Sequence, residues 1–351
     1  MVNSLSHAGI GLLIVSLFGL REREGKLAVL FSLLPDLDFI PYALFILLEN
    51  GLSHETRNSL FYFLGHREFM HSILFIILAV LLLHIAERNI RLTIACFLAI
   101  LSHVYLDYAT SWKMRPLFPF IKESSTLGAF DFFDPVINVI SMIPLFILLL
   151  GYQRNKGKWQ NMDPVYGFLQ QHNRLIIVFI TCLFIIWCAL APFTKLMLVK
   201  YVSATENCDI SYQNMAPVSF GKFLGAYSFN ETHYKIFETT YWNGIYRSDL
   251  IPKRSHATLN AMNSRYISKA AALYNSSLPQ EIDYPVYNIT ESSTTITVVI
   301  SDARSVYVKY WEYFKVEYIF VFDKENSTFT AFTKDQRSRE RSVPLNRFID
   351  A

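Results

Sequence analysis

Six apolar segments, separated by polar connectors, dominate the first 195 residues and constrain most strongly what this chain can fold into. They lie at about residues 5–20, 27–48, 69–86, 92–110, 134–151 and 175–194. Most of them approach the roughly 20 residues that an α-helix needs to cross a bilayer. We therefore predict that residues 1–195 form an all-α transmembrane bundle of about five to six helices.

The composition agrees with a membrane protein and excludes several other classes. Apolar residues make up 52% of the 351-residue chain and charged residues only 17%, whereas soluble domains carry about a quarter charged residues. A disordered chain and a disulfide scaffold are therefore excluded. The 32 Lys and Arg residues nearly balance the 29 Asp and Glu residues. This balance gives no reason to expect a nucleic-acid partner.

The chain changes character after Lys195, where the last long apolar run ends. Residues 196–351 are polar and Tyr-rich, and we predict that they form a small soluble α+β domain. Alternating, β-prone stretches occur at residues 295–300, 316–322 and 328–332, and the short connector between the last two favours a hairpin. We expect a structural ion pair between Asp302 and Arg304. We place these aromatic residues in the core of the domain: Tyr241, Trp242, Tyr246, Tyr310, Trp311 and Tyr313.

The distribution of Lys and Arg over the loops predicts the membrane orientation. With six spans, loops one, three and five carry nine of these residues, and loops two and four carry five. The bias favours an N-terminus on the outer face, and therefore a C-terminal domain on the outer face of a multi-pass plasma (inner) membrane protein. Four N-x-S/T sequons, beginning at Asn230, Asn275, Asn288 and Asn326, all follow the last span.

The membrane half contains an unusual set of polar residues. A single carboxylate in the middle of a bilayer costs about 2.5–3.5 kcal/mol on insertion scales, so the two in the second segment require compensation. Bound cations would supply it. The candidate metal ligands are His7, Asp36, Asp38, His66, His71, His103 and Asp107.

Spacing and topology both favour ligation by these side chains. His103 and Asp107 are four residues apart, which places them about 40° from one another on one helix face. Asp36 and Asp38 follow Pro35, where the missing N–H group favours a break that brings both to one site. We expect His66 on a loop. With six alternating spans, all of these histidines and Asp107 fall at one membrane level.

Imidazole and carboxylate ligands together suit Zn²⁺, Mn²⁺ or Fe²⁺. Seven candidates exceed the four that one tetrahedral zinc takes, so we expect a divalent metal, preferably zinc, in two or three copies. Three other interpretations remain open. Asp36 and Asp38 can form the coupling site of an ion or proton transporter, His103 and Asp107 can be a hydrogen-bonded pair without metal, or the cluster can hold a structural metal in an assembly or regulatory protein. The segment His66–Arg67–Glu68 can also be a solvated loop.

The sequence blocks SHAGIGLL, LLPDLD, GHREFMHSIL and LSHVYLDYATSWKMRPLFPF resemble, in order, those of the inner-membrane metal-dependent hydrolases (the YdjM-like, LexA-binding family). The shared pattern selects all seven candidate ligands together with Arg67 and Thr110. FDFFDPV resembles a branch of the family with an extra C-terminal domain, and marks Asp134. The chain departs from the family pattern at Met70, where Thr is usual, and at Lys113, where Gly is common.

This family is distantly similar to zinc-dependent phospholipase C and P1-type nucleases, which hold metals with His and Asp side chains. The resemblance implies a hydrolase acting on a phosphoester, either a membrane lipid or a small soluble molecule. Metals would activate a water molecule for attack at phosphorus. We expect Asp36 or Asp38 to bridge metals or act as the general base, and the planar guanidinium of Arg67 to hold a phosphate oxygen.

Overall fold

The computed structural model of this chain describes residues 3–254, 261–308, 315–326, 328–335 and 342–344. It divides into two compact units. The first consists of Met1–Tyr42 and Phe63–Met197, and the second of Ala43–Tyr62 and Leu198–Ala351. The domain boundary expected from the sequence falls two residues earlier, after residue 195. That prediction also placed the stretch 43–62 in the membrane domain.

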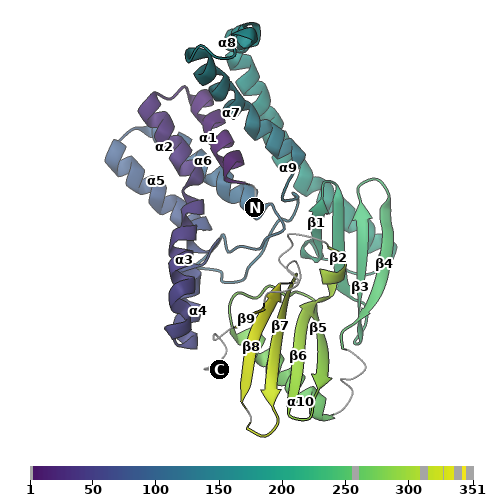
Figure 1. Cartoon of the computed structure of the whole chain (residues 1–351). Helices are drawn as coiled ribbons and strands as arrows, with labels where there is room; N and C mark the ends of the chain where they lie inside the picture. The colour runs from purple at the N-terminus through teal and green to yellow at the C-terminus, as the bar shows by residue number, and fades with distance from the viewer. Residues whose placement is uncertain (1–2, 255–260, 309–314, 327, 336–341, 345–351) are drawn as a thin grey trace. The chain divides into compact units, whose positions relative to one another are not determined.

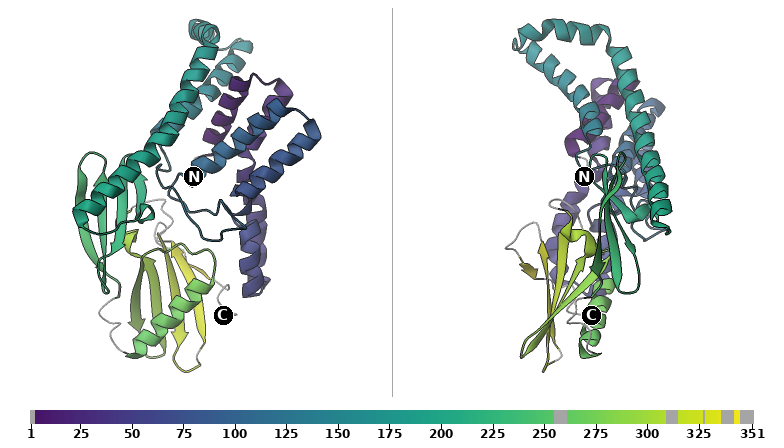
Figure 2. Two further views of the ribbon diagram at one scale, coloured as in Figure 1. Left: turned by 180° about the vertical axis from the view of Figure 1, so that it is seen from behind. Right: turned by 90° about the vertical axis from the view of Figure 1, so that its right-hand side faces the viewer.

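The first unit is built of helices (Figure 1). They are α1 (Ser4–Phe18), α2 (Glu22–Leu33), the start of α3 (Phe39–Leu48), the end of α4 (His54–Leu64), α5 (Ile73–Glu87), α6 (Ile90–Tyr108), α7 (Pro135–Asn155), α8 (Asp163–Gln171) and most of α9 (Asn173–Glu206). Helices α1, α2, α5 and α6 pack side by side, as the left view of Figure 2 shows. Helix α1 also packs closely on α7, because a Cβ atom added at Gly9 of α1 would lie 2.0 Å from the carbonyl oxygen of Ser141 on α7.

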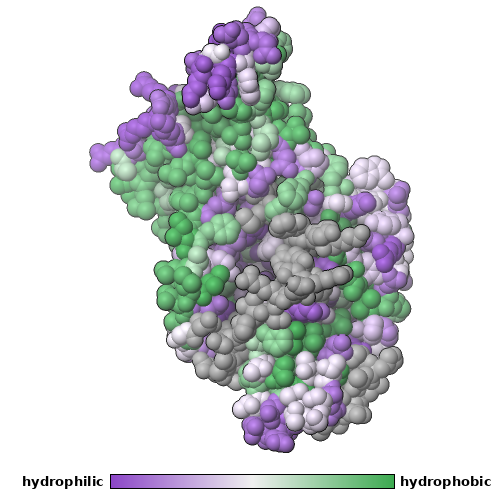
Figure 3. Space-filling view, in the orientation of Figure 1, coloured by the Kyte–Doolittle hydropathy of each residue, from purple (hydrophilic) through white to green (hydrophobic). Residues whose placement is uncertain are grey.

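Within the described part of the chain, three helices, α6, α7 and α9, are long and apolar enough to cross a membrane. The number rises to five when each of two bent pairs, Glu22–Leu33 with Pro35–Leu48 and His54–His71 with Ile73–Glu87, counts as one span. Helix α1 is a shorter apolar helix. Hydrophobic residues cover the outer face of these helices in Figure 3, and Leu82 and Leu175 are 67% and 70% exposed. Lipid contact explains such exposure.

The break expected in the second apolar segment is confirmed. Helix α2 ends at Leu33, and Pro35–Asp38 form one turn of 3-10 helix before α3 begins. The two helices meet at an angle of 55°. Pro35 has no N–H group to continue the helical hydrogen-bond pattern, so the chain turns there and presents both aspartates at the break.

The second unit contains two antiparallel sheets. The first is the meander β1 (Met215–Ser219), β2 (Lys222–Ser228), β3 (His233–Thr240) and β4 (Gly244–Pro252). The second follows the order β5 (Pro285–Glu291), β6 (Thr295–Asp302), β7 (Val316–Asp323), β8 (Phe329–Asp335) and β9 (Ser342–Pro344). The three predicted strands are confirmed as β6, β7 and β8, and β7 pairs with β8 as the expected hairpin.

Alternation along the strands creates the core of the second sheet. Every second residue of β6, from Ile296 to Ile300, is buried and packs with Phe320 of β7. Helix α10 (Ala261–Ser276) covers this face with Ile267 and Leu273. Period-two burial on strands against one apolar helical face is the usual way in which an α+β unit forms its core.

The core positions predicted for the aromatic residues are only partly correct. Tyr241 is half-buried and packs with the core of the first sheet. The prediction is wrong for Trp242 and Tyr246, which are 71% and 48% exposed, because they lie at and just after the turn that joins β3 to β4. The remaining three predicted core aromatics lie outside the described residues: Tyr310, Trp311 and Tyr313.

Helix α4 forms part of a polar stretch that the sequence analysis had treated as a connector. Three hydrogen bonds tie it to the segment that follows α10. The Asn58 amide nitrogen donates to the carbonyl oxygen of Ser276 at 2.7 Å, and its oxygen accepts from the Leu278 N–H at 3.2 Å. His54 Nε2 lies 3.0 Å from Ser277 Oγ. These contacts explain why residues 43–62 belong to the second unit.

Candidate metal centre

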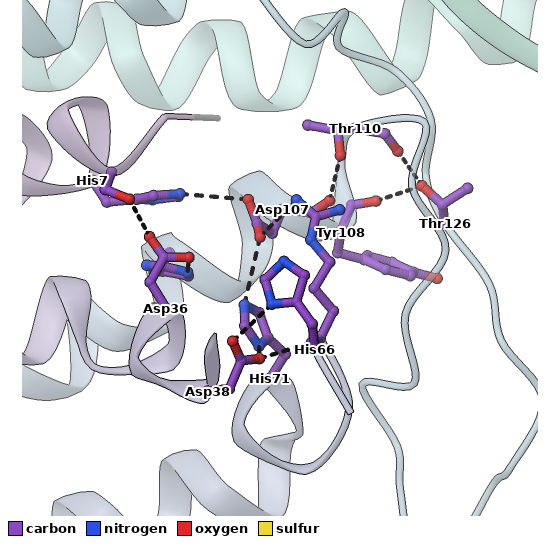
Figure 4. Close-up of polar contacts among 12 residues, drawn as sticks. His7, Asp36, Asp38, His66, His71, Asp107, Tyr108, Thr110 and Thr126 are labelled. Carbon is purple, nitrogen blue, oxygen red and sulfur yellow. Dashed lines mark hydrogen bonds and ion pairs between the residues drawn. The ribbon is translucent and has the colours of Figure 1, made fainter. Parts of the chain in front are cut away.

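All seven predicted ligands gather at one place in the first unit, and Figure 4 labels each of them except His103. Helix α1 supplies His7, and the 3-10 turn after α2 supplies both aspartates. A turn after α4 carries His66, which confirms its expected place outside a regular helix. His71 lies directly before α5, and the last two turns of α6 carry His103 and Asp107. Four segments that are distant in sequence therefore meet at one place.

Four residues form the centre of this cluster. Each of Asp36, His71, His103 and Asp107 offers one ligand atom, and these atoms all lie within 4.8 Å of one another. His103 Nε2 is 3.5 Å from Asp36 Oδ1, and His71 Nε2 is 3.5 Å from Asp107 Oδ2. A cation with bonds of about 2.1 Å holds neighbouring ligand atoms about 3–4 Å apart. The group can therefore hold a metal ion.

Unpaired polar atoms distinguish this cluster from an ordinary buried network. Among the described residues, His103 Nε2, Asp36 Oδ1, both ring nitrogens of His71 and both carboxylate oxygens of Asp107 are buried without a hydrogen bond. Several of them approach one another as ion pairs, but not with hydrogen-bond geometry. Buried polar atoms in native proteins almost always have a partner, so an ion is the partner that fits this donor set.

The far nitrogens of two histidines are fixed by hydrogen bonds. His103 Nδ1 lies 2.7 Å from the carbonyl oxygen of Ser32. A carbonyl only accepts, so Nδ1 carries the proton and Nε2 presents its lone pair to the cluster. His66 Nδ1 likewise lies 2.7 Å from Asp38 Oδ1. Such outer partners orient metal-binding imidazoles.

Asp38 differs from the four central residues because both of its oxygens are already engaged. Oδ1 faces His66, and Oδ2 accepts the backbone N–H of Arg67 at 2.7 Å. Oδ2 also lies 3.1 Å from His71 Nδ1. Asp38 therefore connects the turn after α4 with the start of α5, and it orients two of the imidazoles.

His7 lies beside the central group. Its ring stacks on that of His103 with 3.7 Å between the centroids, and its Nε2 is 3.4 Å from Asp107 Oδ1. Both of its ring nitrogens are buried without a hydrogen bond within the described part of the chain. His7 is therefore placed to contribute a fifth ligand atom.

Arg67 is the only arginine that the sequence placed among the catalytic candidates, and its side chain points into the cluster. One guanidinium nitrogen lies 2.8 Å from Asp107 Oδ2. The guanidinium carbon is 5.8 Å from the centre of the Trp112 ring. The backbone φ of Arg67 is 65°, a left-handed conformation that is uncommon outside glycine and typical of functional sites.

Access to the cluster differs between its members. The side chains of His7, His71, His103 and Asp107 have no exposed surface, whereas those of Asp36 and His66 are 10% and 15% exposed. Ser4 Oγ donates to Asp36 Oδ2 at 2.6 Å on this side. Among the described residues, the cluster is therefore exposed to its surroundings at Asp36 and His66.

The solvated-loop interpretation of His66–Arg67–Glu68 is wrong, because Arg67 and Glu68 are 2% and 4% exposed. Glu68 forms a buried ion pair with Arg115, whose Nε donates to the carbonyl oxygen of Lys122 at 2.6 Å. This pair attaches the loop after α6 to the segment that carries His66. Glu68 is a residue of the site that its local sequence does not reveal, because its partner is 47 residues away in the chain.

Thr110 and Asp134, which the family pattern also marks, have structural contacts. Thr110 Oγ1 donates to the carbonyl oxygen of Asp107 at 2.8 Å and so closes the end of α6. Asp134 Oδ1 accepts the N–H groups of Val136 and Ile137, each at 2.9 Å, at the start of α7. An aspartate before proline is a favoured helix start, which accounts for the Asp-Pro pair.

Comparison with known protein families identifies the family to which the helical N-terminal region is similar. A family model described as YdjM inner membrane protein matches residues 1–198, which contain every residue of the cluster. No curated protein and no solved structure matches the chain. The match covers more than half of the sequence, and the chain therefore belongs to the YdjM inner membrane protein family.

Proposed function

We propose that this chain is a membrane-embedded, metal-dependent hydrolase of phosphoesters. The observation that carries the proposal is the group of four ligand atoms within 4.8 Å of one another, which form no hydrogen bonds with the described residues. A zinc ion bound there would lower the pKa of a water molecule and polarise a phosphoryl oxygen. Mn²⁺ and Fe²⁺ suit the same donor atoms.

We assign a different role to each group of residues in the cluster. Asp36, His71, His103 and Asp107 would hold the metal, with His7 beside them. Asp38 orients His66 and His71 through its two engaged oxygens. Asp36 is the better candidate for the general base, through the oxygen that would not bind the metal, because it is the more exposed of the two aspartates on the helix break.

Arg67 is the proposed phosphate-binding group. Its guanidinium lies buried beside Asp107, and its planar fork of N–H groups can donate to two oxygens of a phosphoester. A charge fixed in a dry site stabilises developing negative charge more effectively than one in water. Glu68 and Arg115 hold the neighbouring loop and take no part in the chemistry.

The orientation proposed from the Lys and Arg bias places the C-terminal domain on the outer face. The hydrogen bonds between Asn58 and the segment after α10 support part of this orientation. They require the connector between the second and third apolar segments to lie on the same side of the membrane as the C-terminal domain. Six spans meet that requirement.

An ion or proton transporter is a second candidate, favoured by the helix break at Pro35–Asp38. Broken helices with acidic side chains often form coupling-ion sites in transporters. Ion flux in proteoliposomes distinguishes the two functions. Flux that is abolished by Asp36→Asn but retained in His66→Ala would favour transport over hydrolysis.

Elemental analysis combined with a substrate screen tests the hydrolase. We expect purified wild-type protein to contain zinc or another divalent transition metal and to hydrolyse phospholipids or soluble phosphodiesters. His103→Ala should lose both the metal and the activity, because Nε2 of His103 faces Asp36 at the centre of the cluster. His172→Ala is the matched control, since its ring packs on Phe168 of α8. Full activity in protein stripped of metal would refute the proposal.

A further inference from the structure

The loop between α6 and α7 carries a group of exposed apolar side chains beside the metal centre. Leu117, Phe120 and Ile121 are 44%, 82% and 45% exposed, and we call these three residues the apolar tip. Neighbouring side chains of the same loop are buried, with Met114 at 0% and Phe118 at 3%. The loop therefore has a packed base and an apolar end that the rest of the described chain leaves uncovered.

The base of the loop is held firmly. The Ile73 N–H donates to the carbonyl oxygen of Pro116 at 2.8 Å, directly at the start of α5. Arg115 connects Glu68 with the carbonyl oxygen of Lys122 and so closes the loop below the tip. Phe118 packs its ring edge on Phe63, with 5.3 Å between the centroids. An ordered base makes the exposure of the tip a fixed feature of the fold.

The contacts of the base also place the tip close to the site. Glu68 directly follows Arg67, whose guanidinium contacts Asp107. Ile73 is two residues beyond His71, and the loop itself begins two residues after Asp107. The same short segments therefore carry the metal ligands and anchor the apolar tip.

The position of the loop identifies what covers the tip. Its two ends continue into α6 and α7, which are both candidate membrane spans, so the loop lies where spans leave the bilayer. Apolar and aromatic side chains flanked by a lysine, here Lys122, suit the boundary between acyl chains and anionic headgroups. Exposed apolar groups of this size in water would be unusual without a partner.

We propose that the apolar tip enters the lipid interface and brings a membrane phospholipid, phosphate group first, to the metal centre. The inference rests on the proposed hydrolase function and narrows its substrate class from phosphoesters in general to lipids. The acyl chains contact Leu117, Phe120 and Ile121. The headgroup then reaches the accessible side of the cluster, at Asp36 and His66.

Fluorescence tests the lipid contact without requiring any hydrolysis. Phe120→Trp is reconstituted into vesicles of phosphatidylcholine and phosphatidylglycerol, and wild type provides the baseline for the five native tryptophans. We expect lipids brominated near the headgroup end of the acyl chain to quench the added fluorescence by at least half, and acrylamide to quench it weakly. Phe229→Trp, at a 51% exposed position after β2, provides the acrylamide-accessible reference. If acrylamide but not brominated lipid quenches the Phe120→Trp fluorescence, the inference is overturned. The inference is also overturned if protection of this tryptophan from acrylamide depends on protein concentration, because a second copy of the chain would then cover the tip.

A pair of substrates with one headgroup tests the substrate class. Phe120→Ser should lower the hydrolysis of a long-chain phospholipid at least 10-fold and leave hydrolysis of its water-soluble dibutyryl analogue within 2-fold of wild type. Phe229→Ser should change neither. If Phe120→Ser loses the same activity on both substrates, or loses activity on neither, the assignment of lipid as the substrate is overturned, while the proposed hydrolase function is not. If wild type hydrolyses neither substrate, the proposed function fails, and the quenching result still decides the lipid contact.

Discussion

The two units of this protein both bury charged side chains, but they satisfy them differently. In the second unit, Arg304 is fully buried and donates to both oxygens of Asp302 at 2.9 Å. It also donates to Asp283 Oδ2 at 2.7 Å. Asp302 in turn accepts three backbone N–H groups, from Asp283, Tyr284 and Arg304 itself. The expectation of a structural ion pair agrees with this network.

The cluster of the first unit has the opposite arrangement. Its central imidazoles and carboxylates lie close together, yet the described chain gives them few hydrogen bonds. A buried network without partners costs stability, so a fold retains one only when something else compensates. The difference teaches that burial of charge alone says little about function. Unsatisfied atoms that converge on one point are what indicate a ligand.

Breaking the satisfied network should have the largest effect on stability. Arg304→Met leaves Asp302 buried without a cation and removes the partner of the partly exposed Asp283, which should cost about 3–5 kcal/mol. Thermal unfolding in detergent measures the loss, and metal content should not change. Arg247→Met is the matched control, because this arginine is 58% exposed and its ion pairs are worth about 0–1 kcal/mol. Loss of metal in Arg304→Met would mean that the two units do not behave independently.

Removing the metal should destabilise only the first unit. Zinc at about 100 times its dissociation constant contributes about 2.7 kcal/mol to the state that binds it. Calorimetry with a chelator and with zinc restored should therefore show a shift in the unfolding of the helical unit, while that of the sheets stays in place. If both units shift in unfolding temperature, or if neither does, the unsatisfied atoms are not the ligands of a cation.

Asp38 offers a finer test of the same cluster, because it orients ligands and is not one of the four central residues. Asp38→Asn replaces one carboxylate oxygen by an N–H₂ group, which would face either His66 Nδ1 or the backbone N–H of Arg67 and cannot accept from it. Changes to such outer partners usually lower metal affinity or activity about 10- to 100-fold. Zinc titration against a competing chelator measures the effect. Asp163→Asn, at an exposed ion pair with Arg154, should leave affinity unchanged, and a similar loss there would discount the result for Asp38.

Local rules predicted much of the site from the sequence. The spacing of His103 and Asp107 required one helix face, and Pro35 required a break beside the two aspartates. Helix α4 and the Glu68–Arg115 pair could not be found in this way, because each depends on partners far along the chain. The contact of the Ser32 carbonyl oxygen with His103 also joins residues far apart in the chain and could not be found from local rules. A Cβ atom at Gly11 would lie 2.4 Å from Ser32 Oγ, so a glycine in α1 permits the close packing that brings the Ser32 carbonyl to His103.

The smallest expected effect on stability comes from Asp134, and the test decides whether this residue belongs to the metal centre. The family resemblance marks this residue together with the ligands, but its carboxylate caps α7 and accepts Trp187 Nε1 at 3.2 Å. Asp134→Ala should therefore cost about 1 kcal/mol of stability, as the loss of a helix cap usually does. Asp134→Ser, which can still cap, should recover most of it. Metal content and hydrolysis should equal those of wild type in both variants. A variant that keeps its stability and loses its metal would place Asp134 inside the metal centre, because a cap acts on the helix and not on the ion.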